Sequence, residues 1–130
     1  MSHQQILTAY GGADPFIGAV VSLIHFDGTD ADTTFTDQKG LTWTARGNAQ
    51  LDTAQKRFGS ASGLFDGSGD FIDTPDGAAV ELGSGNFTAE LFLRPNTTGA
   101  GDRTLVSKPA SGSPFFSPFL VHQNQANLYF

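Results

Sequence analysis

The sequence predicts an all-β protein built as an antiparallel β-sandwich. Apolar and polar residues alternate with a period of two along most of the chain, the pattern of half-buried strands. Clusters of Gly, Asp, Ser and Asn separate these stretches at the short spacing typical of sandwiches. The chain has 130 residues, which is enough for one domain with its own core.

Two stretches show the alternation most clearly. In residues 41–45, Leu41, Trp43 and Ala45 are expected to face the core, and two threonines face the solvent. NFTAELFLRP at 86–95 repeats the pattern until its proline ends the strand. Residues 53–59, TAQKRFG, are compatible with a turn or two of helix capped by Asp52. Further strands are predicted at residues 20–26, 48–52, 62–66, 70–74, 103–107, 118–122 and 126–130.

Charge and composition argue against several classes of partner. The net charge is -6, and the seven basic residues are scattered along the chain, so neither nucleic acid nor an anionic membrane surface is an expected partner. The apolar run FIGAVVSLIHF at 16–26 is too short to span a bilayer, and no targeting signal precedes it. Without cysteine there is no disulfide framework.

The stretch SGLFDGSGDFIDTPDG at 62–77 carries four aspartates among glycines, and these are interpreted as turn residues. Calcium is the alternative cofactor, with Asp66 and Asp70 as its ligands at the first and fifth positions of a loop. Phe71 stands where that loop needs glycine, and Gly77 stands where it needs glutamate. The helix-loop-helix form of a calcium site is therefore excluded.

Nothing in the sequence favours catalysis. There are only two glutamates, and GSASG at 59–63 has Ala61 where a G-x-S-x-G nucleophile would stand. The three histidines lack the spacing of metal ligands, and His25 is interpreted as a strand residue with satisfied nitrogens. Sugar binding needs an accessible aromatic platform. Because Trp43 is assigned to the core, the remaining candidates are Tyr10, Phe92 and Tyr129.

Three segments carry a family resemblance: HFDGTDADTTFTDQKG, LTWTARGNAQLDTAQKRFGSASGLFDGSGDFIDTP and LGSGNFTAELFLRP. With the preceding DPFIGAVVSLIHFDG, residues 14–95 resemble the laminin-G-like, concanavalin A-like lectin domains found in bacteriophage tail and virion proteins. The resemblance implies a two-sheet jelly roll with residues 58–59 and 65–67 as scaffold positions. Phe92 departs from the pattern, since the family usually has a larger aromatic there. Domains of this type continue further, so the sandwich at 14–130 is expected to be partial.

Both ends of the chain are expected to contact partners. Residues 1–13 are polar and are predicted to form an N-terminal arm. At the other end, PFLVH and ANLYF are predicted to form a hairpin around QNQ, leaving an exposed sheet edge. The phenylalanines of SPFFSPF either close the domain's own core or pack against another subunit. The predicted partner contacts are Phe115, Phe116, Phe119, Leu128, Tyr129 and Phe130.

Two functions compete at this point. The first is a noncatalytic bacteriophage virion protein, a tail or capsid decoration component that is synthesised in the host cytoplasm. Its partners would be other virion proteins and copies of itself. The second is a carbohydrate-binding module that recognises host surface glycans. The resemblance permits both, and the Phe-rich loop and unfinished sheet favour the structural role.

Overall fold

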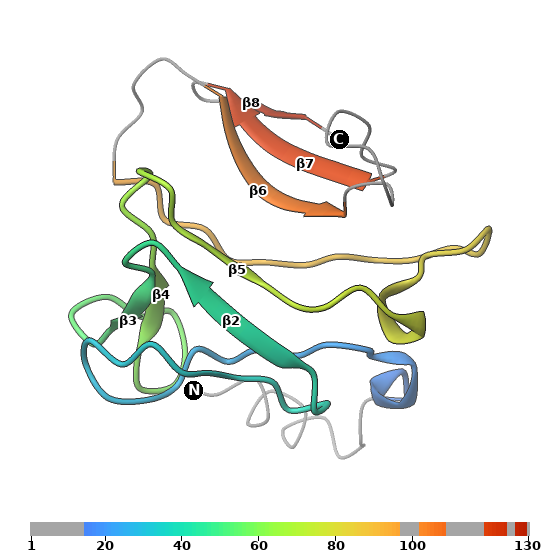
Figure 1. Cartoon of the computed structure of the whole chain (residues 1–130), viewed down its shortest axis with the longest axis horizontal. Helices are drawn as coiled ribbons and strands as arrows, with labels where there is room; N and C mark the ends of the chain where they lie inside the picture. Colours follow the sequence, from blue (N-terminus) through green and yellow to red (C-terminus); the bar gives the residue numbers. More distant parts are fainter. Residues whose placement is uncertain (1–14, 97–101, 109–118, 125–126, 130) are drawn as a thin grey trace. The chain divides into compact units, whose positions relative to one another are not determined.

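The computed structural model describes residues 15–96, 102–108, 119–124 and 127–129 (Figure 1). Every strand pair among them is antiparallel, so the predicted all-β class is confirmed for this part of the chain. The chain divides into two compact units, Met1–Glu90 and Leu91–Phe130. The predicted arm at 1–13 lies outside the described residues.

A three-stranded sheet in the order β1-β2-β5 forms the centre of the first unit. Its strands span Phe35–Thr36, Thr42–Arg46 and Phe71–Asp73. Along β2 the side chains alternate between exposed and half-buried as predicted, with Trp43 and Ala45 on the inner face. Ala45 pairs with Ile72 of β5, so Ile72 packs on the same face. The alternation of residues 41–45 therefore fixes which side of this sheet is buried.

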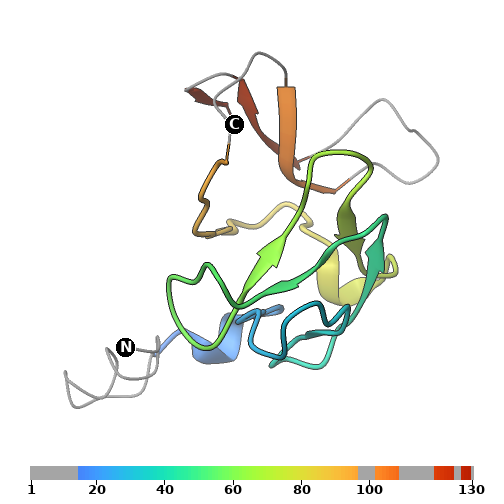
Figure 2. The ribbon, with the colours of Figure 1, turned by 90° about the vertical axis from the view of Figure 1, so that its left-hand side faces the viewer.

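A second, two-stranded sheet joins β3 (Gln50–Asp52) to β4 (Ser62–Leu64). Leu51 is 1% exposed and lies at the centre of a small core. Its buried members are Phe35, Ala49, Leu51 and Ala61, with Phe26, Trp43, Ala45 and Ile72 packed against them. Figure 2 turns the β3–β4 end of this unit toward the viewer.

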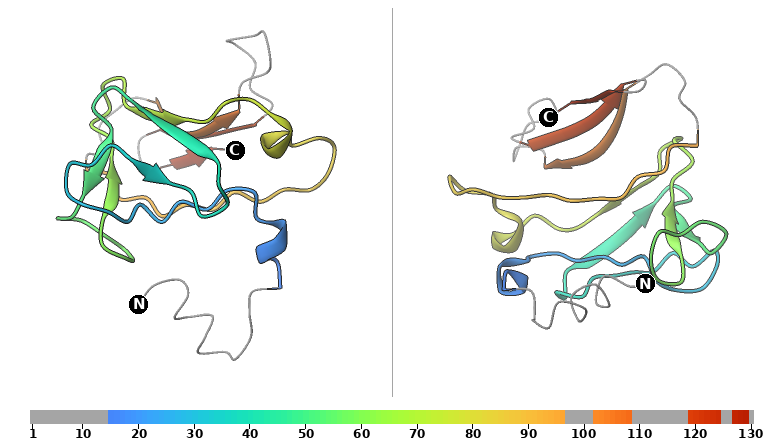
Figure 3. Two further views of the ribbon diagram at one scale, coloured as in Figure 1. Left: turned by 60° about the horizontal axis from the view of Figure 1, so that its bottom comes forward. Right: turned by 180° about the vertical axis from the view of Figure 1, so that it is seen from behind.

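Two single turns of 3-10 helix, η1 (Ile17–Ala19) and η2 (Ala78–Val80), complete the first unit. Figures 1 and 3 place both toward one end of the unit and the β3–β4 pair toward the other. Neither turn was predicted.

Two predictions for the first unit are wrong. The expected strand at 20–26 is reduced to one isolated bridge between Ile24 and Asp37, since no described strand pairs along it, and the positive φ of Phe26, 57°, ends the segment. The expected helix after Asp52 does not form. Asp52 does accept a hydrogen bond from the Ala54 amide at 2.8 Å, but only bends follow.

The second unit is a meander in the order β6-β7-β8. Its strands span Asp102–Lys108, Phe119–Asn124 and Asn127–Tyr129, and the register of β6 against β7 shifts between Thr104 and Val106. The predicted hairpin between the FLVH and NLY stretches is confirmed. However, β7 continues through Gln123 and Asn124, which the sequence placed in the turn.

The predicted strand at 86–95 is the main disagreement. These residues form neither helix nor strand and take part in none of the described sheets. All of residues 83–96 are exposed, including Leu91 at 45%, Phe92 at 70% and Leu93 at 46%. Alternation records which side of a strand could be buried, but a strand also needs a neighbouring backbone to pair with.

Candidate functional site

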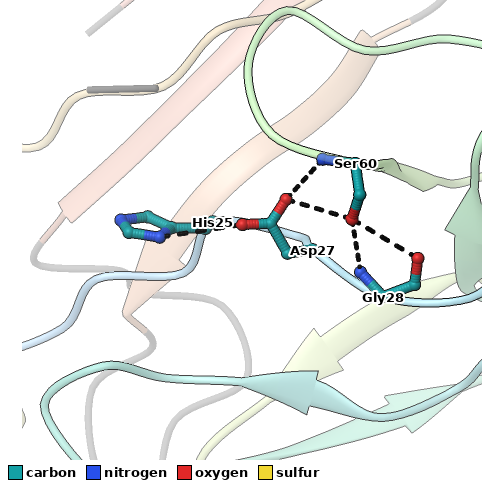
Figure 4. Close-up of polar contacts among 4 residues, drawn as sticks. All are labelled: His25, Asp27, Gly28 and Ser60. Carbon is teal, nitrogen blue, oxygen red and sulfur yellow. Dashed lines mark hydrogen bonds and ion pairs between the residues drawn. The ribbon is translucent and has the colours of Figure 1, made fainter. Parts of the chain in front are cut away.

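The first candidate site joins the loop after His25 to the turn before β4 (Figure 4). One carboxylate oxygen of Asp27 accepts hydrogen bonds from the Ser60 amide at 2.6 Å and from its hydroxyl at 3.2 Å. The Gly28 amide donates back to the Ser60 hydroxyl at 3.0 Å. The other Asp27 oxygen lies 3.9 Å from Nδ1 of His25. Residues 33 positions apart are thus fastened by a reciprocal set of hydrogen bonds.

Two backbone features make this contact possible. Gly59 has a φ of 63°, and a Cβ placed there would collide with the carboxylate of Asp27, so only glycine fits. Phe26 also has a positive φ, which is strained for a bulky side chain. Its ring packs edge to face on Phe35, with centroids 5.7 Å apart. Packing of the Phe26 ring against the core therefore offsets the cost of the backbone conformation that places Asp27 beside Ser60.

The order of these groups differs from that of a nucleophilic triad. In a triad the imidazole stands between the hydroxyl and the carboxylate and accepts the hydroxyl proton. Here the carboxylate of Asp27 stands between Ser60 and His25. His25 therefore lies beside Asp27 and not beside the Ser60 hydroxyl, and these contacts tie the loop to the turn before β4.

The same loop is fastened a second time, to β3. Asp30 accepts from the amide of Thr53 at 3.0 Å and from its hydroxyl at 3.2 Å. The Ala31 amide donates to the Leu51 carbonyl at 2.9 Å, and the Leu51 amide donates to the Asp32 carbonyl at 2.7 Å. Backbone and side-chain bonds together hold residues 27–32 beside the β3–β4 sheet.

Among the described carboxylates Asp37 is the most enclosed, at 8% exposure, and sequence reasoning missed it. It accepts hydrogen bonds from the Ser22 hydroxyl, the Trp43 indole at 3.0 Å and the Lys39 amide at 2.6 Å. Burial alone would raise the pKa of Asp37, but these bonds together hold it below its ordinary value. Trp43, predicted to be buried, is half-buried at the core edge with its N–H satisfied by this carboxylate.

Asp66 and Asp70 shape the turn between β4 and β5. Asp70 accepts from the Asn48 amide and the Asp66 amide, both at 2.8 Å. Asp66 accepts from the Ser68 amide at 2.7 Å and the Asn48 side chain at 3.1 Å. The hydrogen bond from the Ser68 amide, followed by the one from Asn48, lowers the pKa of Asp66. This is the geometry of turn residues, and no metal-binding set of His or acidic side chains occurs within the described residues.

On the outer face of the β1-β2-β5 sheet, Arg46 and Asp73 form a bidentate ion pair at 2.8 and 3.2 Å. Both side chains are about half exposed, so solvent screens the attraction. The hydrogen bond from Arg46 lowers the pKa of Asp73. The pair ties β2 to β5 across the sheet.

The remaining predicted contact residues are divided between described and undescribed parts of the chain. Phe92 lies in the exposed segment after η2, and Phe119 begins β7 as a half-buried residue. Leu128 and Tyr129 lie in β8, which is at the edge of the sheet among the described strands. Tyr10, Phe115, Phe116 and Phe130 lie outside the described residues.

Comparison with known proteins identifies no relative of this chain. Family models, curated proteins and solved structures were all searched, and none matches this chain. Within the described ranges, no helix has the length and apolar character needed to cross a membrane.

Proposed function

We propose that the chain is a noncatalytic structural component of a bacteriophage virion, in the tail or as a capsid decoration, that acts through contacts with other subunits. Copies of itself and other virion proteins are its partners. In this proposal the antiparallel sheets belong to a partial concanavalin A-like jelly roll, and calcium has no role.

One observation carries the proposal. Large apolar side chains are exposed at several places, whereas the carboxylates beside the loops are engaged in internal hydrogen bonds. Three of them, Leu91, Phe92 and Leu93, are consecutive, and a contiguous group of exposed apolar side chains is the kind of surface that other molecules cover. The most exposed of these side chains are Phe16 at 73%, Phe92 at 70%, Val21 at 57% and Phe71 at 53%.

Antibodies raised against the purified protein test this role on phage particles. We expect immunogold label at regular positions on intact particles, with the protein present at a fixed ratio to the major subunits by quantitative mass spectrometry. Particles without label and without peptides of this chain would contradict the virion role.

A carbohydrate-binding module remains the second candidate, and the exposure of Phe92 favours it, because sugar rings stack on accessible aromatic faces. A glycan array on the purified protein separates the two functions. Reproducible binding that Phe92→Ala abolishes would support the module, and an array without binding would support the structural role.

A further inference from the structure

Residues 86–95 have the sequence of a strand without being one. These residues form neither helix nor strand, and apolar side chains of both faces of the alternation are exposed. Leu91 and Leu93 belong to one face of the alternation, and Glu90, Phe92 and Arg94 belong to the other. Leaving such side chains in water is unfavourable, so a second strand laid along this segment would gain both hydrogen bonds and apolar contacts.

The segment is complementary to itself when two copies run antiparallel with Phe92 at the centre. Phe92 then lies opposite Phe92 of the second copy, and Leu91 lies opposite Leu93. Glu90 lies opposite Arg94 of the second copy, and the two-fold symmetry repeats that charge pair. Aromatic, apolar and opposite-charge pairs are the cross-strand combinations that stabilise antiparallel sheets.

Shifting the register of this strand pair by one or two residues gives less favourable cross-strand pairs. Centring the pair on Glu90 places two like charges opposite each other, and centring it on Leu91 places Glu90 opposite Phe92. The register centred on Phe92 also accommodates Pro95. If the Phe92 pair exchanges hydrogen bonds, Pro95 occupies a position where no N–H is required by the partner strand.

We propose that residues 86–95 form an antiparallel strand pair with the same residues of a second copy, centred on Phe92 and specified by the Glu90–Arg94 pairs. This deepens the proposed function, on which it rests for its biological setting, by naming the partner and the strand. Within one chain the same two charges cannot pair, since four residues of extended chain separate them by about 13 Å.

Reversal of the two charges tests the register. Each single variant, Glu90→Arg or Arg94→Glu, places like charges opposite each other twice in the dimer. Sedimentation velocity of the full chain should show a dimer for the parent protein and a Kd raised about tenfold or more for each variant. A mixture of the two variants should form a heterodimer of parental strength, because each arginine then meets a glutamate. The double variant should dimerise like the parent.

Matched controls exclude a general effect of charge. Glu81→Arg and Lys56→Glu make the same chemical exchanges at exposed sites outside the segment and should leave the dimer Kd unchanged. Circular dichroism of each variant confirms that it is folded before its association is compared.

Three results would overturn the strand pair. These are a parent protein that stays monomeric at all concentrations, charge variants that dimerise like the parent, and a mixture no stronger than either variant alone. The failure of the virion role is a separate result, because particles without label leave the association of the purified protein unaffected.

Discussion

In the Met1–Glu90 unit the strands are two to five residues long, whereas in the Leu91–Phe130 unit β6 and β7 pair along six residue positions. Short strands leave the first unit dependent on side-chain bonds across long sequence separations, such as Asp27 to Ser60 and Asp37 to Ser22. The acidic residues are divided between the two units in the same way. Residues 1–90 contain twelve of the thirteen acidic residues, and Asp102 is the other one.

This difference shows two ways of ordering a β-rich chain. The main-chain hydrogen bonds of a ladder remain when one side chain is exchanged, while a carboxylate hydrogen bond disappears when its one aspartate is replaced or protonated. The first unit should therefore respond more strongly than β6–β7 to the loss of single carboxylates and to acid.

The largest expected effect comes from Leu51→Ala in the core of the first unit. Leu51 is 1% exposed, and truncating a buried leucine costs about 2–5 kcal/mol of unfolding free energy. Amide hydrogen exchange followed by mass spectrometry should show faster exchange in β2, β3 and β5 with little change in β6 and β7. Equal acceleration of all strands would mean that the two units unfold together, which would break the comparison.

Asp37→Asn is expected to cause the next largest loss of unfolding free energy. The amide keeps the shape of the carboxylate but loses its charge, and one of its two polar atoms becomes a donor facing the donors of Ser22 and Trp43. The unfolding free energy should fall by about 1–3 kcal/mol. Trp43 fluorescence reports the change directly. As the control, Asp52→Asn removes the same charge at a carboxylate that accepts from the Ala54 amide, a bond that the asparagine oxygen can keep, and it should cost much less.

Gly59→Ala should lower the unfolding free energy somewhat less. Backbone strain alone costs about 1–2 kcal/mol, and the collision of the new Cβ with Asp27 adds to it. Gly67 also has a positive φ, 85°, but no atom lies near its Cβ position. Gly67→Ala therefore measures the cost of backbone strain without a collision. The difference between the two variants in chemical denaturation measures the Asp27–Ser60 contact. Equal costs would show that this contact contributes little to stability.

Seven strands could be predicted from alternation and turn residues, because those patterns are local. The failures at 20–26 and 86–95 have one cause, since an apolar or alternating run does not reveal whether a partner strand lies beside it. Asp66 and Asp70 were recognisable as turn residues from the adjacent glycines. Asp37 was not, because its partners Ser22 and Trp43 lie in other segments and no local motif announces them.

Acid should weaken the first unit gradually. The pKa values of Asp32, Asp37, Asp66 and Asp73 are all lowered by hydrogen bonds in the folded state. A carboxyl whose folded pKa lies below its unfolded value of about 3.9 stabilises the fold above that pH. The contribution is lost as the pH falls through the lowered folded pKa. Denaturation measured between pH 7 and pH 2 should show this loss below about pH 4.

The sharpest control for acid is the Asp37→Asn variant, whose acid-dependent loss should be smaller than that of the parent. Hydrogen exchange at low pH should again affect β2 and β5 more than β6 and β7. A parent protein with constant stability down to pH 2 would show that the carboxylate bonds do not hold the first unit together.

The smallest expected effect is that of calcium. The oxygens of Asp66 and Asp70 already accept four hydrogen bonds from Asn48, Ser68 and Asp66, so an ion would have to displace them. Chelator or millimolar calcium should therefore change Tm by less than about 1 °C, since only a ligand that binds the folded state raises its stability. Asp70→Asn should lower Tm slightly with or without calcium, because it alters the bonds from the two backbone amides. A rise of several degrees with calcium that Asp70→Asn removes would instead make this turn a metal site, and the first unit would then owe part of its order to a bound ion.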